Sequence, residues 1–98
     1  MKSYDKAAWH IDAGEDKNSV ISRFKDVFSF LEAKNMLNDE GMETLEYGMD
    51  SSVSLNSNMV TDDGEKFLDA YYDVVLKQDL NEFRNNLEKS YNEFTAEK

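Results

Sequence analysis

Hydrophobic residues recur at helical spacing along most of this chain. From residue 18 to residue 35 they form one broad apolar face, made of Val20, Ile21, Phe24, Val27, Phe28 and Leu31. Further stretches of the same kind begin near Asp39, Asp62 and Asp79. Asn18 or Ser19 is expected to cap the first helix. The pattern predicts a mainly α protein, a compact bundle of about four helices forming a single domain over residues 1–98.

Two nearly identical hexapeptides, MLNDEG at 36–41 and MVTDDG at 59–64, precede two of these helices. In each, a good N-cap residue, Asn38 or Thr61, is followed by two carboxylates where the helix dipole favours negative charge. Neither copy is followed by the ligands that an EF-hand loop requires, and two copies are too few for a solenoid. The repeat therefore predicts two helix starts.

The segment DSSVSLNSNM at residues 50–59 breaks the helical spacing. Its apolar residues Val53, Leu55 and Met59 occupy odd-numbered positions, which is typical of a short strand or an extended loop. Only residues 9–11 offer a plausible pairing partner for this segment, and the predicted fold therefore allows a short two-stranded β ribbon beside the helices. The last helix is expected to begin at Asp79, with Glu82 in the capping-box position and no glycine or proline before it.

Composition limits the classes of function. The chain has 98 residues, no cysteine and a formal net charge of −10, which excludes disulfides and cysteine chemistry and disfavours nucleic acid and anionic lipid as partners. Neither a signal-peptide run nor a membrane-spanning run is present in the sequence, so we expect a cytoplasmic protein without membrane contact.

The negative charge is concentrated in the middle of the chain. Residues 39–73 hold ten acidic residues and one basic residue, Lys66, a net of −9, whereas the other 63 residues are nearly neutral. On helical wheels these acids form two stripes, Asp39, Glu43, Glu46 and Asp50 on one helix and Asp62, Glu65, Asp69 and Asp73 on the next.

Each stripe has a tyrosine near it, Tyr47 beside the first and Tyr72 near the second. Like charges three or four residues apart destabilise a helix slightly. One interpretation is therefore a docking face for a basic protein partner, with the tyrosines as anchors. The alternative is a solvated face whose acids favour the first helical turns.

Residues suited to catalysis are few. The chain has one histidine and none of the motifs typical of metalloproteases, P-loop proteins or serine hydrolases, so neither an enzyme nor a cofactor is expected. His10 with Asp5 and Asp12 is the one candidate metal site. The alternative, which we favour, is that Trp9 and Ile11 anchor the N-terminal segment, with His10 hydrogen-bonded at its edge.

Two motifs resemble a small bacterial family of unknown function. YDKAAWH at residues 4–10 is similar to its Tyr-Asp-x-Ala-x-Trp-His signature, and GEKFLDAYY at 64–72 to its Gly-x-x-Phe-x-x-x-Tyr-Tyr segment. Proteins of this kind look like immunity partners of polymorphic toxins, which block a toxin domain by binding it. The resemblance implies a cytoplasmic inhibitor, and the acidic stripes would suit a toxin with a cationic surface, such as a nuclease.

Two hypotheses about function follow. The first is a non-enzymatic inhibitor of the immunity type, which binds a basic toxin domain through the acidic stripes, Tyr47 and Tyr72. The second is an adaptor or regulatory subunit, in one form a homodimer, whose apolar self-contact is supplied by residues 53–59 or by the last helix.

Overall fold

Helices account for most of the computed structural model, which describes residues 1–97. The elements, in chain order, are β1 (Ser3–Lys6), α1 (Ala7–Asp12), α2 (Lys17–Ala33), α3 (Asp39–Tyr47), β2 (Ser54–Asn56), the 3-10 turn η1 (Ser57–Met59), α4 (Asp62–Leu76), the 3-10 turn η2 (Leu80–Glu82) and α5 (Phe83–Ala96). This architecture confirms the predicted mainly α bundle with a short two-stranded ribbon.

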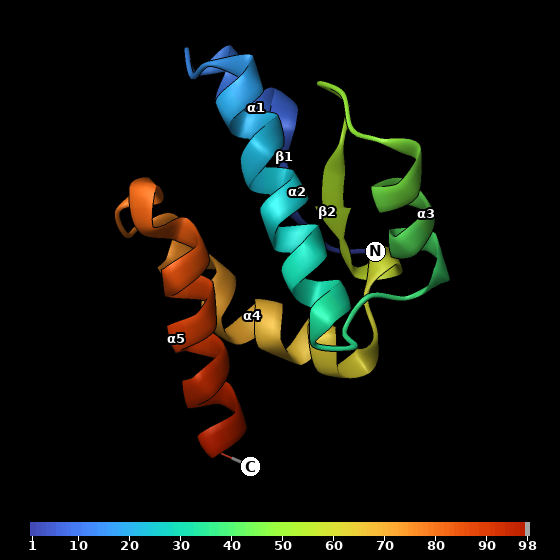
Figure 1. Ribbon diagram of the computed structural model, residues 1–98, viewed down its shortest axis with the longest axis vertical. Coiled ribbons are helices and arrows are strands. Elements are labelled where there is room, and N and C mark those ends of the chain that lie inside the picture. The colour runs from blue at the N-terminus through green and yellow to red at the C-terminus, as the bar shows by residue number, and fades with distance from the viewer. Residues whose placement is uncertain (98) are drawn as a thin grey trace.

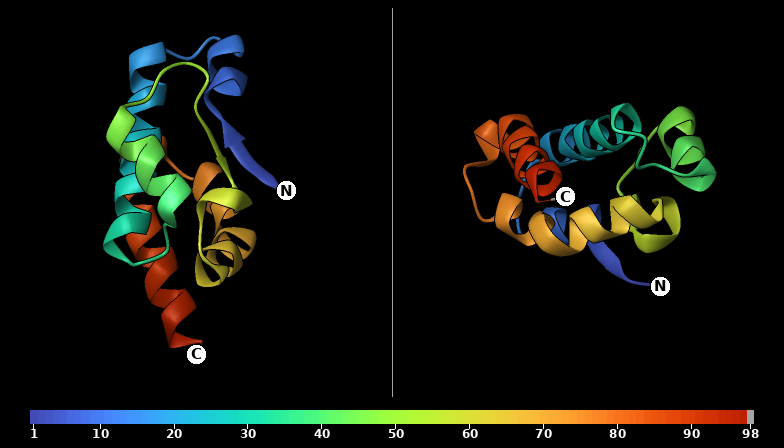
Figure 2. Two further views of the ribbon diagram at one scale, coloured as in Figure 1. Left: turned by 90° about the vertical axis from the view of Figure 1, so that its right-hand side faces the viewer. Right: turned by 90° about the horizontal axis from the view of Figure 1, so that it is seen from below.

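Helix α2 runs through the middle of the molecule, with α5 on one side and α3 on the other (Figure 1). Helix α4 crosses α2 and α5, as the view from below shows (Figure 2). The ribbon of β1 and β2 fills the space between α3, α4 and the start of α2. Helix α3 therefore lies at the edge of the fold, whereas α4 packs one face against α2 and α5.

The core is rich in aromatic rings where α2, α4 and α5 meet. Phe67 of α4 lies at the centre, fully buried, with its ring centroid 5.5 Å from that of Phe94 and 6.0 Å from those of Phe30 and Tyr91. The contacts of Phe67 with Phe94 and Tyr91 are edge-to-face, and such contacts add to the gain from burying apolar area. The aromatic cluster fixes α4 and α5 against α2.

The ribbon forms, but its first strand differs from the prediction. Strand β1 pairs antiparallel with β2, with Asp5 opposite Leu55 and Lys6 opposite Ser54, whereas residues 9–11 lie in α1. The Ala7 N–H extends the connection by donating to the carbonyl of Val53 at 3.0 Å. The prediction that residues 9–11 pair with this segment was wrong, because α1 begins directly after β1 and makes these residues helical.

The predicted helix caps are partly confirmed. Asn38 and Thr61 cap α3 and α4, each accepting a hydrogen bond from a glycine N–H. Helix α2 is instead capped by Asp16, whose side chain accepts from the Ser19 N–H, so the prediction of Asn18 or Ser19 was wrong. Asp79 caps η2.

The C-terminal part begins later than predicted. Helix α4 ends at Leu76 and α5 starts at Phe83, with η2 between them, so the two helices do not run on as one. Glu82 accepts a hydrogen bond from the Asn85 side chain and does not close a capping box. The turn allows α5 to fold back onto α2 and α4.

The two hexapeptides pair with each other. The Asn38 N–H donates to the Met59 carbonyl at 3.0 Å, and the Thr61 N–H donates to the Met36 carbonyl at 2.9 Å. Since Asn38 and Thr61 occupy matching places in the two copies, as do Met36 and Met59, the bonds are related by an approximate local two-fold. An antiparallel bridge between residues 37 and 60 lies at its centre.

Both copies contain a glycine because the pairing brings backbone close to each helix start. A Cβ on Gly41 would lie 2.4 Å from the Met59 carbonyl oxygen, and one on Gly64 would lie 2.7 Å from that of Met36. The repeated sequence is therefore explained by two helix starts, as predicted, that also pack against one another.

Candidate functional site

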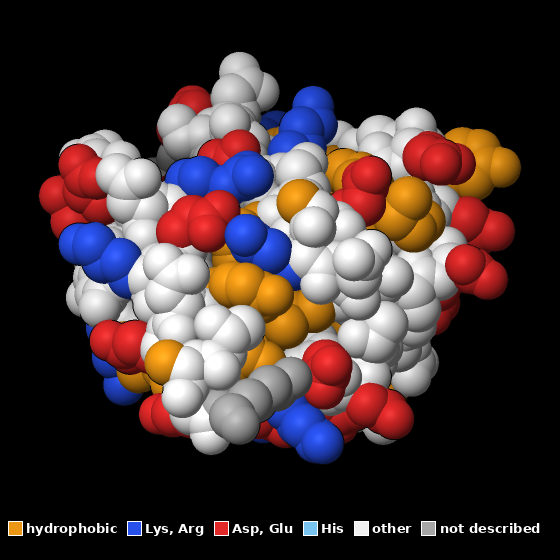
Figure 3. Space-filling model, turned by 60° about the horizontal axis from the view of Figure 1, so that its bottom comes forward, with side chains coloured by type: hydrophobic (Ala, Val, Ile, Leu, Met, Phe, Trp, Pro, Cys, Tyr) orange, Lys and Arg blue, Asp and Glu red, His pale blue; other side chains and the backbone are white. Residues whose placement is uncertain are grey.

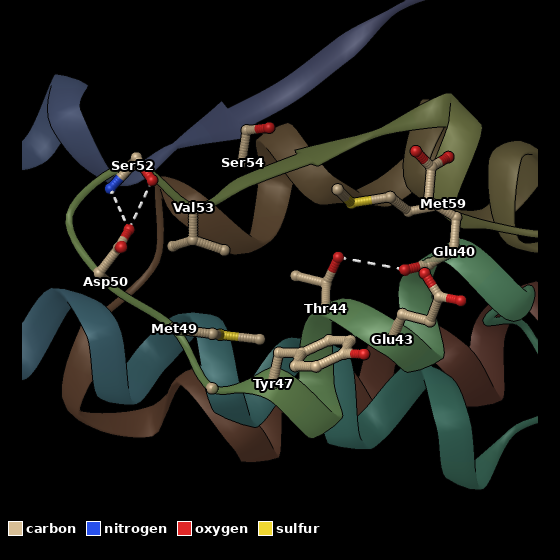
Figure 4. Close-up of a pocket in the computed structure, with 11 residues that line it drawn as sticks. Glu40, Glu43, Thr44, Tyr47, Met49, Asp50, Ser52, Val53, Ser54 and Met59 are labelled. Carbon is tan, nitrogen blue, oxygen red and sulfur yellow. Dashed lines mark hydrogen bonds between the residues drawn. The ribbon is translucent and has the colours of Figure 1, made fainter.

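The candidate site is a groove of about 450 Å³ between α3 and the segment that leads into β2. Helix α3 forms one wall, and the chain from residue 49 to residue 54 forms the other (Figure 4). The groove is lined by Glu40, Glu43, Thr44, Tyr47, Gly48, Met49, Asp50, Ser52, Val53, Ser54 and Met59. It combines carboxylates with an aromatic ring and two thioethers.

The carboxylates of α3 lie in the open. Asp39, Glu43 and Glu46 are exposed, and within residues 1–97 no hydrogen bond or ion pair engages their side chains. Three acidic groups on one short helix without a basic partner give α3 a negative potential. Glu43 lines the groove together with Glu40, whereas Asp39 and Glu46 lie outside its lining.

Asp50 belongs to the groove but not to the helix, which ends at Tyr47. Its carboxylate accepts hydrogen bonds from the Ser52 hydroxyl and the Ser52 N–H, and these bonds, with a smaller contribution from Lys17, lower the pKa of Asp50. The stripe predicted over four positions is therefore three helical acids followed by one that holds a turn.

Tyr47 is the most exposed aromatic side chain of residues 1–97, with 88% of its surface accessible. It lies along the α3 wall of the groove (Figure 4). On the side of the molecule that carries α3, at the right-hand edge of Figure 3, acidic and hydrophobic side chains are visible and Lys and Arg are not. The prediction of an exposed tyrosine beside the first stripe agrees with this arrangement.

The second stripe has a different environment. Asp62, Asp69 and Asp73 are exposed and Glu65 is half-buried, but the Asp69 carboxylate accepts a hydrogen bond from Lys2 Nζ at 2.8 Å.

This hydrogen bond lowers the pKa of Asp69, and it raises the pKa of Lys2 with help from Asp73 and Glu65. The acids of α4 therefore face a basic residue at the start of the chain, whereas those of α3 do not.

Tyr72 does not lie on the surface, so its predicted role as an exposed anchor was wrong. The residue is 3% exposed, and its hydroxyl donates to Asp5 Oδ2 at 2.8 Å. Burial, together with the adjacent Asp5 carboxylate, raises the pKa of Tyr72 well above its usual value. The face of α4 that carries Tyr72 is covered by the N-terminal segment.

A chain of polar contacts surrounds this hydroxyl. Asp5 Oδ1 lies 2.6 Å from His10 Nε2, and His10 Nδ1 lies 2.8 Å from Glu15 Oε2. Arg23 then donates to Glu15 Oε1 at 3.0 Å. Burial of Glu15 opposes its ionisation, but the bond from Arg23 and the contact with His10 outweigh it and lower the pKa of Glu15. We call Tyr72, Asp5, His10, Glu15 and Arg23 the charged chain.

The sequence expectations for the N-terminal segment are met in part. His10 is hydrogen-bonded as expected, but Trp9 is 53% exposed and does not anchor the segment. Its ring is covered on one side by Lys6 Nζ, 5.6 Å from the ring centroid. Ile11 is half-buried against the core as predicted, and Tyr4 takes the place of Trp9, because it is buried and directs its hydroxyl at the Glu65 carbonyl.

The candidate metal ligands do not converge on one point. Asp12 is exposed and outside the charged chain, and each ring nitrogen of His10 already faces a carboxylate. Among residues 1–97, no group of three or more His, Cys, Asp or Glu side chains has the geometry to hold a metal ion.

Sequence reasoning missed two parts of these sites. Thr44, Met49 and Met59 line the groove, but their contribution depends on how the two hexapeptides pair. Glu15 and Arg23 join the charged chain from a loop and from α2. No local pattern distinguishes them from solvated charges, since their partner His10 lies on a different element.

Comparison of the chain with family models, with curated proteins and with solved structures found no match. No helix within residues 1–97 is both long and apolar enough to cross a membrane. The function of the chain is therefore inferred from the groove and its charges.

Proposed function

We propose that this chain is a non-enzymatic protein-binding protein of the immunity type, which blocks a cationic toxin domain through the acidic face of α3. The observation that carries the proposal is the unpaired set of carboxylates Asp39, Glu43 and Glu46 beside the exposed Tyr47. Acids placed together without basic neighbours destabilise their helix slightly, so a cationic partner accounts for them better than the fold does.

The groove fits the chemistry of a basic surface. Carboxylates at its rim attract a positive partner over long range and speed association. Tyr47 offers a rigid, amphipathic ring of the kind that dominates binding energy at interfaces. Met49 and Met59 supply adaptable apolar contact inside the groove. A nuclease toxin is the most suitable class, because its phosphate-binding face is cationic and would be occupied by the carboxylates in place of phosphates.

The contact surface is narrower than the sequence predicts. Glu43, Glu46, Tyr47 and Asp50 remain in it, together with Asp39. The α4 residues Asp62, Glu65, Asp69 and Asp73 become secondary, because Lys2 already faces three of them, and Tyr72 leaves the surface through burial.

The test begins with a partner eluted by a salt gradient from lysate of the native host and identified by mass spectrometry. Association of the purified partner is then followed by stopped-flow fluorescence at two salt concentrations. Glu43→Lys with Glu46→Lys is expected to slow association about tenfold or more and to flatten its salt dependence. Asp62→Lys with Asp73→Lys is the matched control, since it changes the net charge equally on α4. Equal slowing by both pairs would contradict a contact at α3.

The adaptor or homodimer alternative has less support. Its proposed self-contact used residues 53–59, of which Val53 and Leu55 are buried within the chain. The last helix also uses its apolar side internally, through Phe83, Leu87 and Phe94. Sedimentation at two concentrations separates the hypotheses, because a concentration-dependent dimer would favour the alternative.

A further inference from the structure

The ring of His10 lies between two carboxylates. Each ring nitrogen faces a carboxylate oxygen, Asp5 Oδ1 at 2.6 Å and Glu15 Oε2 at 2.8 Å. A carboxylate only accepts hydrogen bonds, and a neutral imidazole has one N–H, so two ionised carboxylates at these distances are both satisfied only by a ring with both nitrogens protonated. Both oxygens of Asp5 act as acceptors elsewhere in the structure, Oδ1 from the Lys6 N–H and Oδ2 from the Tyr72 hydroxyl, which is the bonding expected of a carboxylate.

The charge count supports the same state. The charged chain contains two carboxylates, Asp5 and Glu15, and one guanidinium, Arg23, while Tyr72 stays neutral because its pKa is raised. With His10 positive the chain is electrically balanced. With His10 neutral, Arg23 compensates Glu15 and the negative charge of Asp5 has no counterpart. Asp5 is 3% exposed, and an uncompensated buried charge is costly.

The groups that face His10 come from each element around it. Asp5 belongs to β1, Glu15 to the connection after α1, and Arg23 reaches the site from α2 through Glu15. The ring of Phe24, also on α2, meets the imidazole edge-on with centroids 6.5 Å apart. Tyr72 of α4 reaches it through Asp5. His10 therefore joins the N-terminal segment to two helices of the bundle.

The same segment supports one wall of the groove. Lys6 lies opposite Ser54 in the ribbon, and the Ala7 N–H donates to the Val53 carbonyl at 3.0 Å. Val53 and Ser54 line the groove on the side away from α3. A displacement of β1 therefore moves this wall.

We propose that His10 is a positioning residue for the groove: as an imidazolium between Asp5 and Glu15, it fixes β1 and α1 against α2 and α4, and the ribbon transmits that placement to Val53 and Ser54. The use of the groove as a contact surface rests on the proposed function. The placement of its wall by His10 is a property of the free protein and is measured without a partner.

The first measurement is the nitrogen-15 spectrum of the imidazole in the full chain at pH 7. The chain contains a single histidine, so the two ring signals are assigned without ambiguity. Two protonated nitrogens are expected. The shifts of a neutral tautomer, with one protonated and one bare nitrogen, would overturn the proposal whatever the variants do.

The second measurement is amide hydrogen exchange. His10→Gln keeps a hydrogen-bonding side chain but removes the charge, and is expected to speed exchange of the Ala7 amide about tenfold. Exchange of the Phe28 amide, in the middle of α2, shows whether the core itself has also loosened. Asp12→Asn is the matched control, because it removes an exposed charge from the same segment and should leave the Ala7 amide unchanged.

Charge balance is tested by a second substitution. Adding Glu15→Gln to His10→Gln removes one carboxylate, so Asp5 and Arg23 balance again and the Ala7 exchange rate is expected to fall back toward the native rate. A double variant that exchanges at least as fast as His10→Gln would overturn the role of charge. Such a failure leaves the α3 contact standing, since that proposal is tested by Glu43→Lys with Glu46→Lys.

Discussion

Helices α3 and α4 begin from nearly the same six residues, but their acidic stripes lie in different surroundings. Three acids of the α4 stripe face Lys2, which directly precedes β1, and the helix is buried on its other side through Phe67 and Leu68. Helix α3 buries Gly41 alone, and its acids have no basic neighbour within residues 1–97. Equal local sequence thus produces one helix that supports the fold and one that presents charge.

An acidic stripe indicates a binding surface only when the residues that surround it in the fold are known. On α4 the charge is partly used to bind the start of the chain, which accounts for it within the fold. On α3 the fold gives no such account, and this difference is the basis for the proposed partner. Four experiments test the difference, in decreasing order of expected effect.

The largest difference is expected in the core contributions of the two helices. Phe67→Ala removes a fully buried ring from the aromatic cluster and should lower the free energy of unfolding by about 3–5 kcal/mol. Leu45→Ala, at a half-buried position of α3, should cost about 1 kcal/mol. Urea unfolding followed by circular dichroism measures both. Similar costs would show that α3 is as much a part of the core as α4.

The paired hexapeptides are tested by their glycines. Gly41→Ala and Gly64→Ala place a methyl group against a backbone carbonyl that is itself hydrogen-bonded. Each should destabilise the protein by about 1–3 kcal/mol. Helix propensity alone predicts the opposite sign, since alanine favours a helix by about 1 kcal/mol over glycine. A rise in melting temperature in either variant would therefore contradict the close packing.

A smaller effect is expected from the like charges on α3. Glu43→Lys places a base between Asp39 and Glu46, at spacings of four and three residues, and should stabilise the protein by about 0.5 kcal/mol at low salt. Asp69→Lys on α4 instead brings a second base to Lys2 and should give no gain. Melting temperatures at low and high salt measure both. If Asp69→Lys stabilises equally, the two stripes are electrostatically alike.

The smallest effect concerns the link between Lys2 and Asp69. Lys2→Met removes the hydrogen bond that lowers the pKa of Asp69, so this pKa should return toward its usual value, measured by carbon-13 titration of the carboxyl group. A lowered carboxyl pKa stabilises the folded state above the usual titration range and loses that effect as pH falls. Native protein and variant should therefore differ slightly in stability near neutral pH and converge in acid. An unchanged pKa of Asp69 in the variant would show that Lys2 does not pair with this carboxylate.

Local patterns predicted the helices because their signals are local. The caps Asn38 and Thr61 and the apolar face of α2 need only neighbouring residues to act. Strand β1 was missed since its four residues depend on a partner some fifty positions away. The presence of a ribbon was predictable from residues 53–59, but its pairing was not.

The errors at the candidate site have one physical cause. A helical wheel places Tyr72 near the α4 stripe but does not show that β1 covers that face. Tyr47 has no such cover, and its exposure agreed with the prediction. For the same reason the charged chain was not predictable, since Arg23 is linked to Asp5 only through Glu15 and His10, which the fold brings between them. Periodicity identifies faces of a helix, and tertiary contacts decide which of them remain open.

The pairing of the two hexapeptides also closes the chain between them into a loop. Because the backbone hydrogen bonds at Asn38 and Thr61 hold the two copies side by side, residues 42–58 leave and re-enter the bundle at nearly one place. The exposed part of this excursion before β2 is expected to tolerate changes of length and sequence at low cost to the remainder, whereas Val53 and Leu55 are fixed by burial and by the ribbon. It contains most of the groove, including Glu43 and Tyr47. Substitutions on the exposed wall of the groove are therefore expected to leave the aromatic core intact.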